Sequence, residues 1–119
     1  MFHMVLKGLW RKMEKRILKF SVINQTIKKD NKSDFSGIAM GTSGYLIAQF
    51  DFSKEWNKLF KVAEFRKRNS DKYYPVKIVH NRCEVPKEVT DTIQWTVKVV
   101  GKKGDTVLTT NTCAVMQEV

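Results

Sequence analysis

Apolar and polar residues alternate with a period of two along most of the chain after residue 16. In the segment YLIAQFDF, Leu46, Ala48, Phe50 and Phe52 are separated by single, mostly polar residues. A period of two places alternate side chains on opposite faces of a strand, so these four residues are expected to face a core. The middle of the chain is therefore predicted to be a half-buried strand.

A corner is predicted directly after this strand. Ser53 ends the alternation, and its hydroxyl is placed to cap a single helical turn that leaves Trp56 free to plug the corner. The alternation resumes from Phe60 to Phe65. We expect this second strand to return along the first.

Further segments with the same alternation are separated by turn-forming residues. Pro75 lies inside one of them and predicts an edge strand, because proline cannot donate a hydrogen bond to a neighbouring strand. A tight turn is expected at His80 to Arg82, and Gly104 in the sequence KKGD is expected to supply the positive φ of a hairpin turn. The strands predicted in this way are 17–27, 45–52, 60–65, 73–78, 83–86, 93–100 and 107–116.

About seven short strands at intervals near ten residues predict an all-β chain. Parallel sheets require long crossover helices, and the pattern contains none, so we expect an antiparallel, immunoglobulin-like β-sandwich. A chain of 119 residues is expected to form one such domain. The residues predicted for its core are Phe50, Phe52, Trp56, Phe65, Trp95 and Val97.

The first sixteen residues follow a different pattern. Apolar residues between Phe2 and Met13 recur at the three- and four-residue spacing of a helix, with basic residues opposite. Such a segment is expected to lie on an anionic membrane or a partner, to pack on its own domain, or to precede a true start at Met13. We divide the chain into a basic amphipathic extension, 1–16, and a sandwich domain, 17–119.

Charge and cysteine content narrow the choice of function only a little. The chain has 22 Lys and Arg residues against 12 Asp and Glu, a net charge of +10, which attracts phosphates, anionic membranes or acidic proteins alike. No apolar run reaches the roughly 18 residues of a membrane-spanning helix. Cys83 and Cys113 match no metal or redox spacing, so we expect two buried, reduced thiols, with a disulfide as the alternative.

Candidate chemistry is sparse. His3 and His80 have no partner at a catalytic or metal-binding spacing, and the carboxylate pairs lie in loops among lysines. The sequence therefore predicts no enzyme, no metal site and no cofactor.

The strongest candidate for a binding surface is the basic loop RKRNSDK at 66–72. Two tyrosines follow it, and mixed cations and aromatic rings suit a nucleic acid, although a solvated hairpin tip is the favoured interpretation. The lysines of the KKGD hairpin turn are expected to add to this binding surface if that turn lies at the same end of the sandwich as the basic loop. The residues expected to carry binding are Arg66, Lys67, Arg68 and Lys72, with Lys102 and Lys103 from that turn.

Three motifs occur in order along the chain: FDFSKEWNKLFKVAEF at 50–65, CEVPKEV at 83–89 and WTVKVVGKKGDTVLTTN at 95–111. Together they resemble the small β-sandwich domain at the N-terminus of tail, baseplate and fibre-associated proteins of phages and prophages of Gram-positive bacteria. The resemblance implies structural roles for the residues that match it. These are Phe52, Glu55, Trp56, Ala63, Phe65, Val85, Pro86, Val89, Trp95, Thr109, Thr110 and Asn111.

The resemblance implies a non-enzymatic protein–protein interaction module, found in the virion or in the cytoplasm of the bacterial host. Its implied partners are a second copy of the chain, tail proteins or a host protein. In the resembled family the domain usually carries a longer fibre, whereas here the sequence stops soon after the last strand. The alternative is therefore a free-standing effector that binds a host protein or nucleoprotein, such as an inhibitor of an antiphage defence system.

Overall fold

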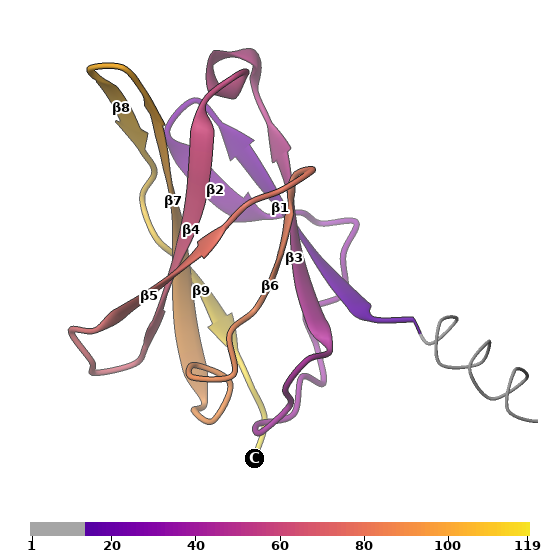
Figure 1. Ribbon diagram of the computed structural model, residues 1–119. Coiled ribbons are helices and arrows are strands. Elements are labelled where there is room, and N and C mark those ends of the chain that lie inside the picture. The colour runs from indigo at the N-terminus through magenta and orange to yellow at the C-terminus, as the bar shows by residue number, and fades with distance from the viewer. Residues whose placement is uncertain (1–13) are drawn as a thin grey trace, which may run out of the picture.

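The alternating segments pair into two sheets that face each other across one core (Figure 1). The computed structural model describes residues 14–119. The first sheet contains, in spatial order, β2 (Thr26–Lys29), β1 (Arg16–Ile23), β3 (Leu46–Phe52) and β6 (Arg82–Glu84). The second contains β5 (Tyr73–Lys77), β4 (Phe60–Lys67), β7 (Gln94–Lys103) and β8 (Thr106–Thr109), and β9 (Cys113–Met116) pairs with the other end of β7. The predicted all-β sandwich is confirmed.

Nine strands occur within residues 14–119 because two predicted segments are each interrupted. Asn24 adopts a φ of 54° and forms a two-residue turn with Gln25, which separates β1 from β2. Asn111 separates β8 from β9 by bonding to the first sheet. Its backbone N–H donates to the carbonyl oxygen of Gln25 at 3.2 Å, and its side-chain oxygen accepts from the N–H of Ile27 at 2.8 Å.

Two pairing predictions are wrong. The sandwich is not wholly antiparallel, because β1 and β3 run parallel, with Phe20 opposite Phe50. The chain reverses in β2 and a long loop before β3, so this parallel pair needs no helix. In addition, β4 does not return along β3: β3 pairs with β1 and β6, whereas β4 pairs with β5 and β7. The corner instead carries the chain from one sheet to the other.

The corner contains the predicted single helical turn, a 3-10 turn at Lys54–Trp56 (η1). Ser53 does not cap it with its side chain, contrary to the prediction. Its hydroxyl accepts a hydrogen bond from the backbone N–H of Asn24 at 2.9 Å and donates to the carboxylate of Glu55. Trp56 is fully buried, and its indole N–H donates to the carbonyl oxygen of Asn24 at 2.7 Å. These bonds tie the corner to the β1–β2 turn.

The core has the composition that the alternation predicts, with one exception. Phe52 is only half-buried, because it lies at the end of β3, where it packs against the edge of the buried cluster. The other predicted core residues are buried: Phe50, Trp56, Phe65, Trp95 and Val97.

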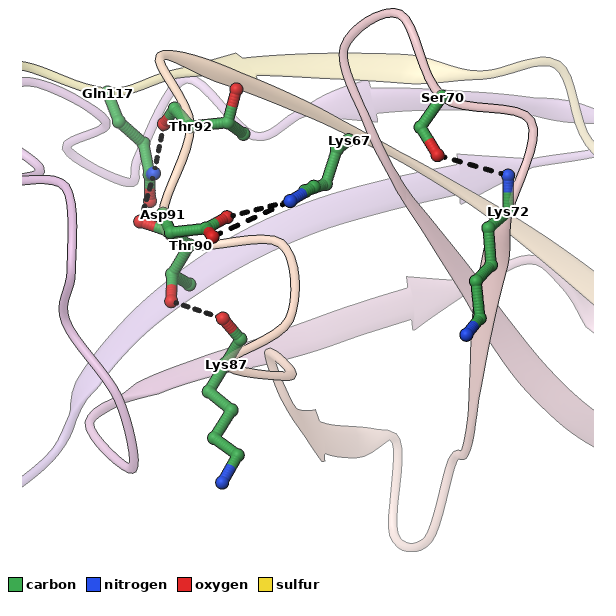
Figure 2. Close-up of polar contacts among 8 residues, drawn as sticks. All are labelled: Lys67, Ser70, Lys72, Lys87, Thr90, Asp91, Thr92 and Gln117. Carbon is green, nitrogen blue, oxygen red and sulfur yellow. Dashed lines mark hydrogen bonds and ion pairs between the residues drawn. The ribbon is translucent and has the colours of Figure 1, made fainter.

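A buried polar group at the C-terminal end completes the core. Gln117 accepts a hydrogen bond from the indole N–H of Trp95 at 3.0 Å. Its amide nitrogen donates to the carbonyl oxygens of Thr90 and Thr92 at 2.9 and 2.6 Å (Figure 2). This single side chain therefore fastens the segment after β9 to the loop before β7.

The local turn predictions are confirmed. Pro75 lies in β5, which forms an edge of the second sheet. His80 and Asn81 both have positive φ in the tight turn before β6, and Gly104 has a φ of 57° in the β7–β8 turn. The predicted N-terminal helix falls almost entirely on residues 1–13, outside the described residues, and Arg16 already belongs to β1.

Candidate binding surface

The basic residues predicted to act together lie at two ends of the second sheet. β4 and β7 are antiparallel, with Lys67 opposite Trp95 and Phe60 opposite Lys102. The β4–β5 loop and the β7–β8 turn are therefore separated by the length of β4, roughly 23 Å at about 3.3 Å per residue. Figure 1 shows these two tips at opposite ends of the molecule. Lys102 and Lys103 consequently do not join the basic loop.

Arg66 and Lys67 are half-buried residues of β4 and not part of the loop tip. Lys67 forms an ion pair with Asp91, its ammonium nitrogen 3.3 Å from a carboxylate oxygen (Figure 2). The Arg66 guanidinium lies 5.3 Å from the ring centroid of Tyr73. The side chains at 66 and 67 thus already have partners within the domain, which leaves Arg68 as the exposed cation of the three.

These contacts change the expected effect of neutralising the loop. Replacing Arg66, Lys67 and Arg68 together with serine is expected to lower the free energy of unfolding by about 1 kcal/mol, because a cation–π contact and an ion pair are lost. Replacing Arg68 alone is expected to change it by less than about 0.5 kcal/mol. Urea unfolding followed by circular dichroism measures both. Equal stability of the triple variant and the parent would show that the contacts of Arg66 and Lys67 contribute nothing.

A different surface gathers exposed apolar and basic side chains: the outward side of the second sheet, here called the outer face. Ala63, Phe65 and Val97 point into the core, so the alternating positions of β4 and β7 point outward. Phe60 lies opposite Lys102, which lies opposite Val107 on β8. Phe60 and Val107 are 54% and 52% exposed. Two large apolar side chains therefore flank one lysine at this end of the sheet.

The next row continues the apolar strip. Val62 lies opposite Val100 on β7 and opposite Lys77 on β5. The Lys77 ammonium lies 5.3 Å from the ring centroid of Phe60, so its charge sits beside the apolar strip. A shallow hollow of about 140 Å³ is lined by Phe60, Val62, Glu64, Val100 and Lys102.

Basic and aromatic groups occupy the other half of the outer face. The ring of Tyr73 has the Lys98 ammonium 4.8 Å and the Arg66 guanidinium 5.3 Å from its centroid. Lys98 also forms an ion pair with Glu64 at 3.5 Å. Over both halves, four cations and one carboxylate give the outer face a net charge of +3, from Arg66, Lys77, Lys98, Lys102 and Glu64.

Sequence reasoning missed this surface as a unit, although a signal for it was present. Phe60 and Val62 occupy positions of β4 that alternate with the buried Ala63 and Phe65. Two apolar residues in register on the solvent side of a strand whose other side already faces the core indicate an exposed apolar patch, which is typical of a second contact. Only the strand pairing shows that Val107 and Val100 join them.

The residues that match the resembled family lie mainly in the core and at the bonds between the sheets. Trp56, Phe65 and Trp95 are fully buried, Pro86 is half-buried, and Asn111 joins β2 through the hydrogen bond already described. Glu55 accepts from the Ser53 hydroxyl. Among the family-matching residues, Thr109 lies on the outer face, where it pairs with Val100.

The cysteines are free thiols, so the alternative of a disulfide between them is wrong. Cys83 is buried as predicted, whereas Cys113 is only half-buried because it starts a short edge strand. Burial raises the pKa of the Cys83 thiol to about 12, and burial also raises the pKa of Cys113. Neither thiol has the lowered pKa of a reactive cysteine.

Alkylation with iodoacetamide at neutral pH is expected to modify Cys113 before Cys83, and both more slowly than in the urea-unfolded chain. Folding raises the pKa of Cys83 from 9.0 to about 12. The neutral Cys83 thiol therefore contributes stability that is expected to be fully present below pH 9.0 and to be lost as the pH rises towards 12. Mass spectrometry of timed samples gives the order of modification. Faster modification of Cys83 would contradict the burial of β6 against the core.

Within residues 14–119 no three His, Cys, Asp or Glu side chains are grouped so as to hold a metal ion. The same residues contain no helix long and apolar enough to cross a membrane. Comparison with models of known protein families finds no match, and comparison with curated proteins finds none either.

Proposed function

We propose that the chain is a non-enzymatic protein–protein interaction module of a phage or prophage tail or baseplate, and that it contacts its partner through the outer face. The observation that carries this proposal is the row in which Phe60 and Val107, each more than half exposed, flank Lys102. Exposed apolar side chains gathered on one sheet face are typical of a contact surface. The motif resemblance supports the phage assignment, and the sandwich fold agrees with it.

The charge of the outer face favours a partner of a different kind over a second copy of the chain. A symmetric pair of outer faces would bring Lys77, Lys98 and Lys102 of one copy close to the same residues of the other. Like charges placed opposite one another cost free energy and suppress such pairing. A surface with apolar groups and carboxylates, as on an acidic tail protein, is complementary to this face.

The arrangement around Tyr73 favours a protein over a single-stranded nucleic acid. Bases bind such surfaces by stacking on exposed aromatic rings. Arg66 and Lys98 both lie within 5.3 Å of the Tyr73 ring centroid, so a stacked base would have to displace a cation. The apolar strip around Phe60 and Val62 has no counterpart in a phosphate backbone.

A free-standing effector that binds an acidic host protein, for example to inhibit an antiphage defence, is the second candidate. The same basic outer face favours it, because a surface that resists self-pairing suits a protein that acts alone. Both candidates place the contact on the same residues, and they differ in the partner.

The partner is identified by capture. The tagged full chain is incubated with lysate of the bacterium that carries this sequence, before and after phage particles are produced, and bound proteins are quantified by mass spectrometry. Stoichiometric tail or baseplate proteins after induction are the expected result. A stoichiometric host protein in both lysates would favour the effector, and no stoichiometric protein in either would contradict both proposals.

Light scattering after size-exclusion chromatography tests whether the charge of the outer face prevents pairing of two copies of the chain. The chain alone is expected to be a monomer at low salt, because the cations of the outer face repel those of a second copy. A stable dimer at low salt that Phe60→Ser dissociates would overturn the choice of a different partner.

A further inference from the structure

The opposite side of the sandwich carries a second candidate site, on the outward side of the first sheet. A hollow of about 500 Å³ lies there, within the size range of small-molecule sites. This hollow, here called the Arg82 hollow, is lined among others by Lys19, Lys32, Gln49, Asp51 and Arg82. We infer that the Arg82 hollow binds a small sugar phosphate.

Strand register builds the centre of this hollow. Lys19 on β1 lies opposite Gln49 on β3, and Gln49 lies opposite Arg82 on β6. The neighbouring residues Phe20 and Phe50 are buried, so these three side chains point away from the core. With strands about 4.8 Å apart, Lys19 and Arg82 are separated by roughly 10 Å at the backbone. That interval leaves room for one phosphate group above Gln49.

One hydrogen bond orients Gln49 and Arg82 so that both can donate to a ligand. The Nε of Arg82 donates to the side-chain oxygen of Gln49 at 3.0 Å. This bond orients the Gln49 amide so that its nitrogen remains a donor, and it leaves both Nη groups of Arg82 available. A guanidinium with two parallel N–H groups binds phosphate oxygens in a bidentate manner.

The charges of the hollow favour a ligand that carries hydroxyl groups in addition to a phosphate. Within the described part of the chain, no ion pair of 4.0 Å or less involves Lys19, Lys32 or Arg82. Asp30 and Asp51 also line the hollow, so three cations and two carboxylates leave a net charge of +1. Asp30 is engaged through the backbone N–H of Lys32 at 2.9 Å. Asp51 is two residues along β3 from Gln49 and faces the same way, where its carboxylate can accept hydrogen bonds from sugar hydroxyls.

A sugar phosphate meets both requirements. Its phosphate matches Lys19 and Arg82, and its hydroxyl groups match Asp51, whereas inorganic phosphate would make only the first of these contacts. The site lies on the sheet opposite the outer face, so occupancy of one surface does not block the other. This inference does not depend on the proposed protein partner.

Nuclear magnetic resonance titration of the full chain with ribose 5-phosphate tests the site. Amide shifts are expected to saturate and to be largest at Lys19, Gln49 and Arg82. Inorganic phosphate is expected to bind about tenfold more weakly than ribose 5-phosphate, because it lacks the hydroxyl that donates to the Asp51 carboxylate, a charge-assisted bond that contributes about 1.5 kcal/mol or more. Ribose alone is expected to cause no shifts, because it lacks the phosphate that pairs with Lys19 and Arg82. Equal affinity for phosphate and ribose 5-phosphate, or shifts spread evenly over all lysines, would overturn the inference.

Matched variants separate the site from general charge. Arg82→Gln is expected to weaken ribose 5-phosphate binding about tenfold, and Arg82→Lys, which keeps the charge without the fork of donors, by an intermediate factor. Lys87→Gln removes an exposed charge outside the hollow and is expected to change the affinity by less than about twofold. Arg82 is itself exposed, so the variants are expected to stay folded. Similar losses for Arg82→Gln and Lys87→Gln would overturn the site.

Discussion

Replacing Trp56 with alanine is expected to lower the free energy of unfolding by about 3 to 5 kcal/mol, as for other fully buried aromatic residues. The ring is 0% exposed and lies against Phe52, with centroids 5.5 Å apart. It is packed so closely that a Cβ atom added to Gly101 would come within 2.9 Å of it. The substitution also leaves the carbonyl oxygen of Asn24 without its indole donor. Urea unfolding followed by far-ultraviolet circular dichroism measures the loss.

Phe60→Ala is the matched control, because it removes an aromatic side chain that is 54% exposed. It is expected to lower the free energy of unfolding by less than about 1 kcal/mol, the scale of the exposed cation–π contact with Lys77 that is lost. Trp56→Phe keeps most of the apolar volume but loses the N–H, and an intermediate loss is expected. If Trp56→Ala unfolded at the same urea concentration as Phe60→Ala, the corner would not be part of the core.

Gln117→Leu is expected to lower the free energy of unfolding by about 3 kcal/mol, since it leaves buried polar groups without partners. The Trp95 indole N–H would lose its acceptor, and the carbonyl oxygens of Thr90 and Thr92 would lose their donor. No water replaces the lost partner easily, because Gln117 is only 5% exposed. Urea unfolding measures the loss, and intrinsic tryptophan fluorescence is expected to change as well.

Gln25→Leu is the matched control for Gln117. Gln25 donates a hydrogen bond to the carbonyl oxygen of Thr109 at 3.1 Å, but it is exposed, so water can replace the bond. Its expected cost is less than about 0.5 kcal/mol. Equal costs at the two positions would mean that the polar group around Gln117 is open to solvent.

The sequence allowed the strands, the corner and most of the core to be predicted, because each depends on residues close together in the chain. The period of two identifies which side chains of a strand face inward, and Phe50, Phe65 and Trp95 follow it. Pro75 cannot donate a backbone hydrogen bond and Gly104 tolerates a positive φ, so their positions at an edge and in a turn were also predictable.

Strand pairing was predicted less well, since alternation specifies a face and not a partner. β3 and β4 are neighbours in sequence, yet they lie in different sheets, and β3 pairs in parallel with β1. The buried group around Gln117 was missed for a similar reason. A glutamine near the chain end gives no sign in the sequence that Trp95 and the 90–92 loop will surround it.

The candidate surface was the hardest feature to predict. RKRNSDK stands out because its charges are consecutive, but in the fold Arg66 and Lys67 contact Tyr73 and Asp91. The outer face combines residues from four strands, and residues of different strands become neighbours only once the register is known.

The most direct test of the outer face as contact surface compares three versions of the tagged chain in capture of the partner. Phe60→Ser combined with Val107→Ser removes the two exposed apolar side chains of the outer face, and Ile23→Ser removes one that is 59% exposed on the first sheet. Circular dichroism first establishes that all three are folded. The double variant is expected to retain about a tenth of the partner or less, and Ile23→Ser to retain the parent amount, because central apolar contacts contribute about 1 to 2 kcal/mol each. Capture by the double variant equal to that of the parent would contradict the proposal that the outer face contacts the partner.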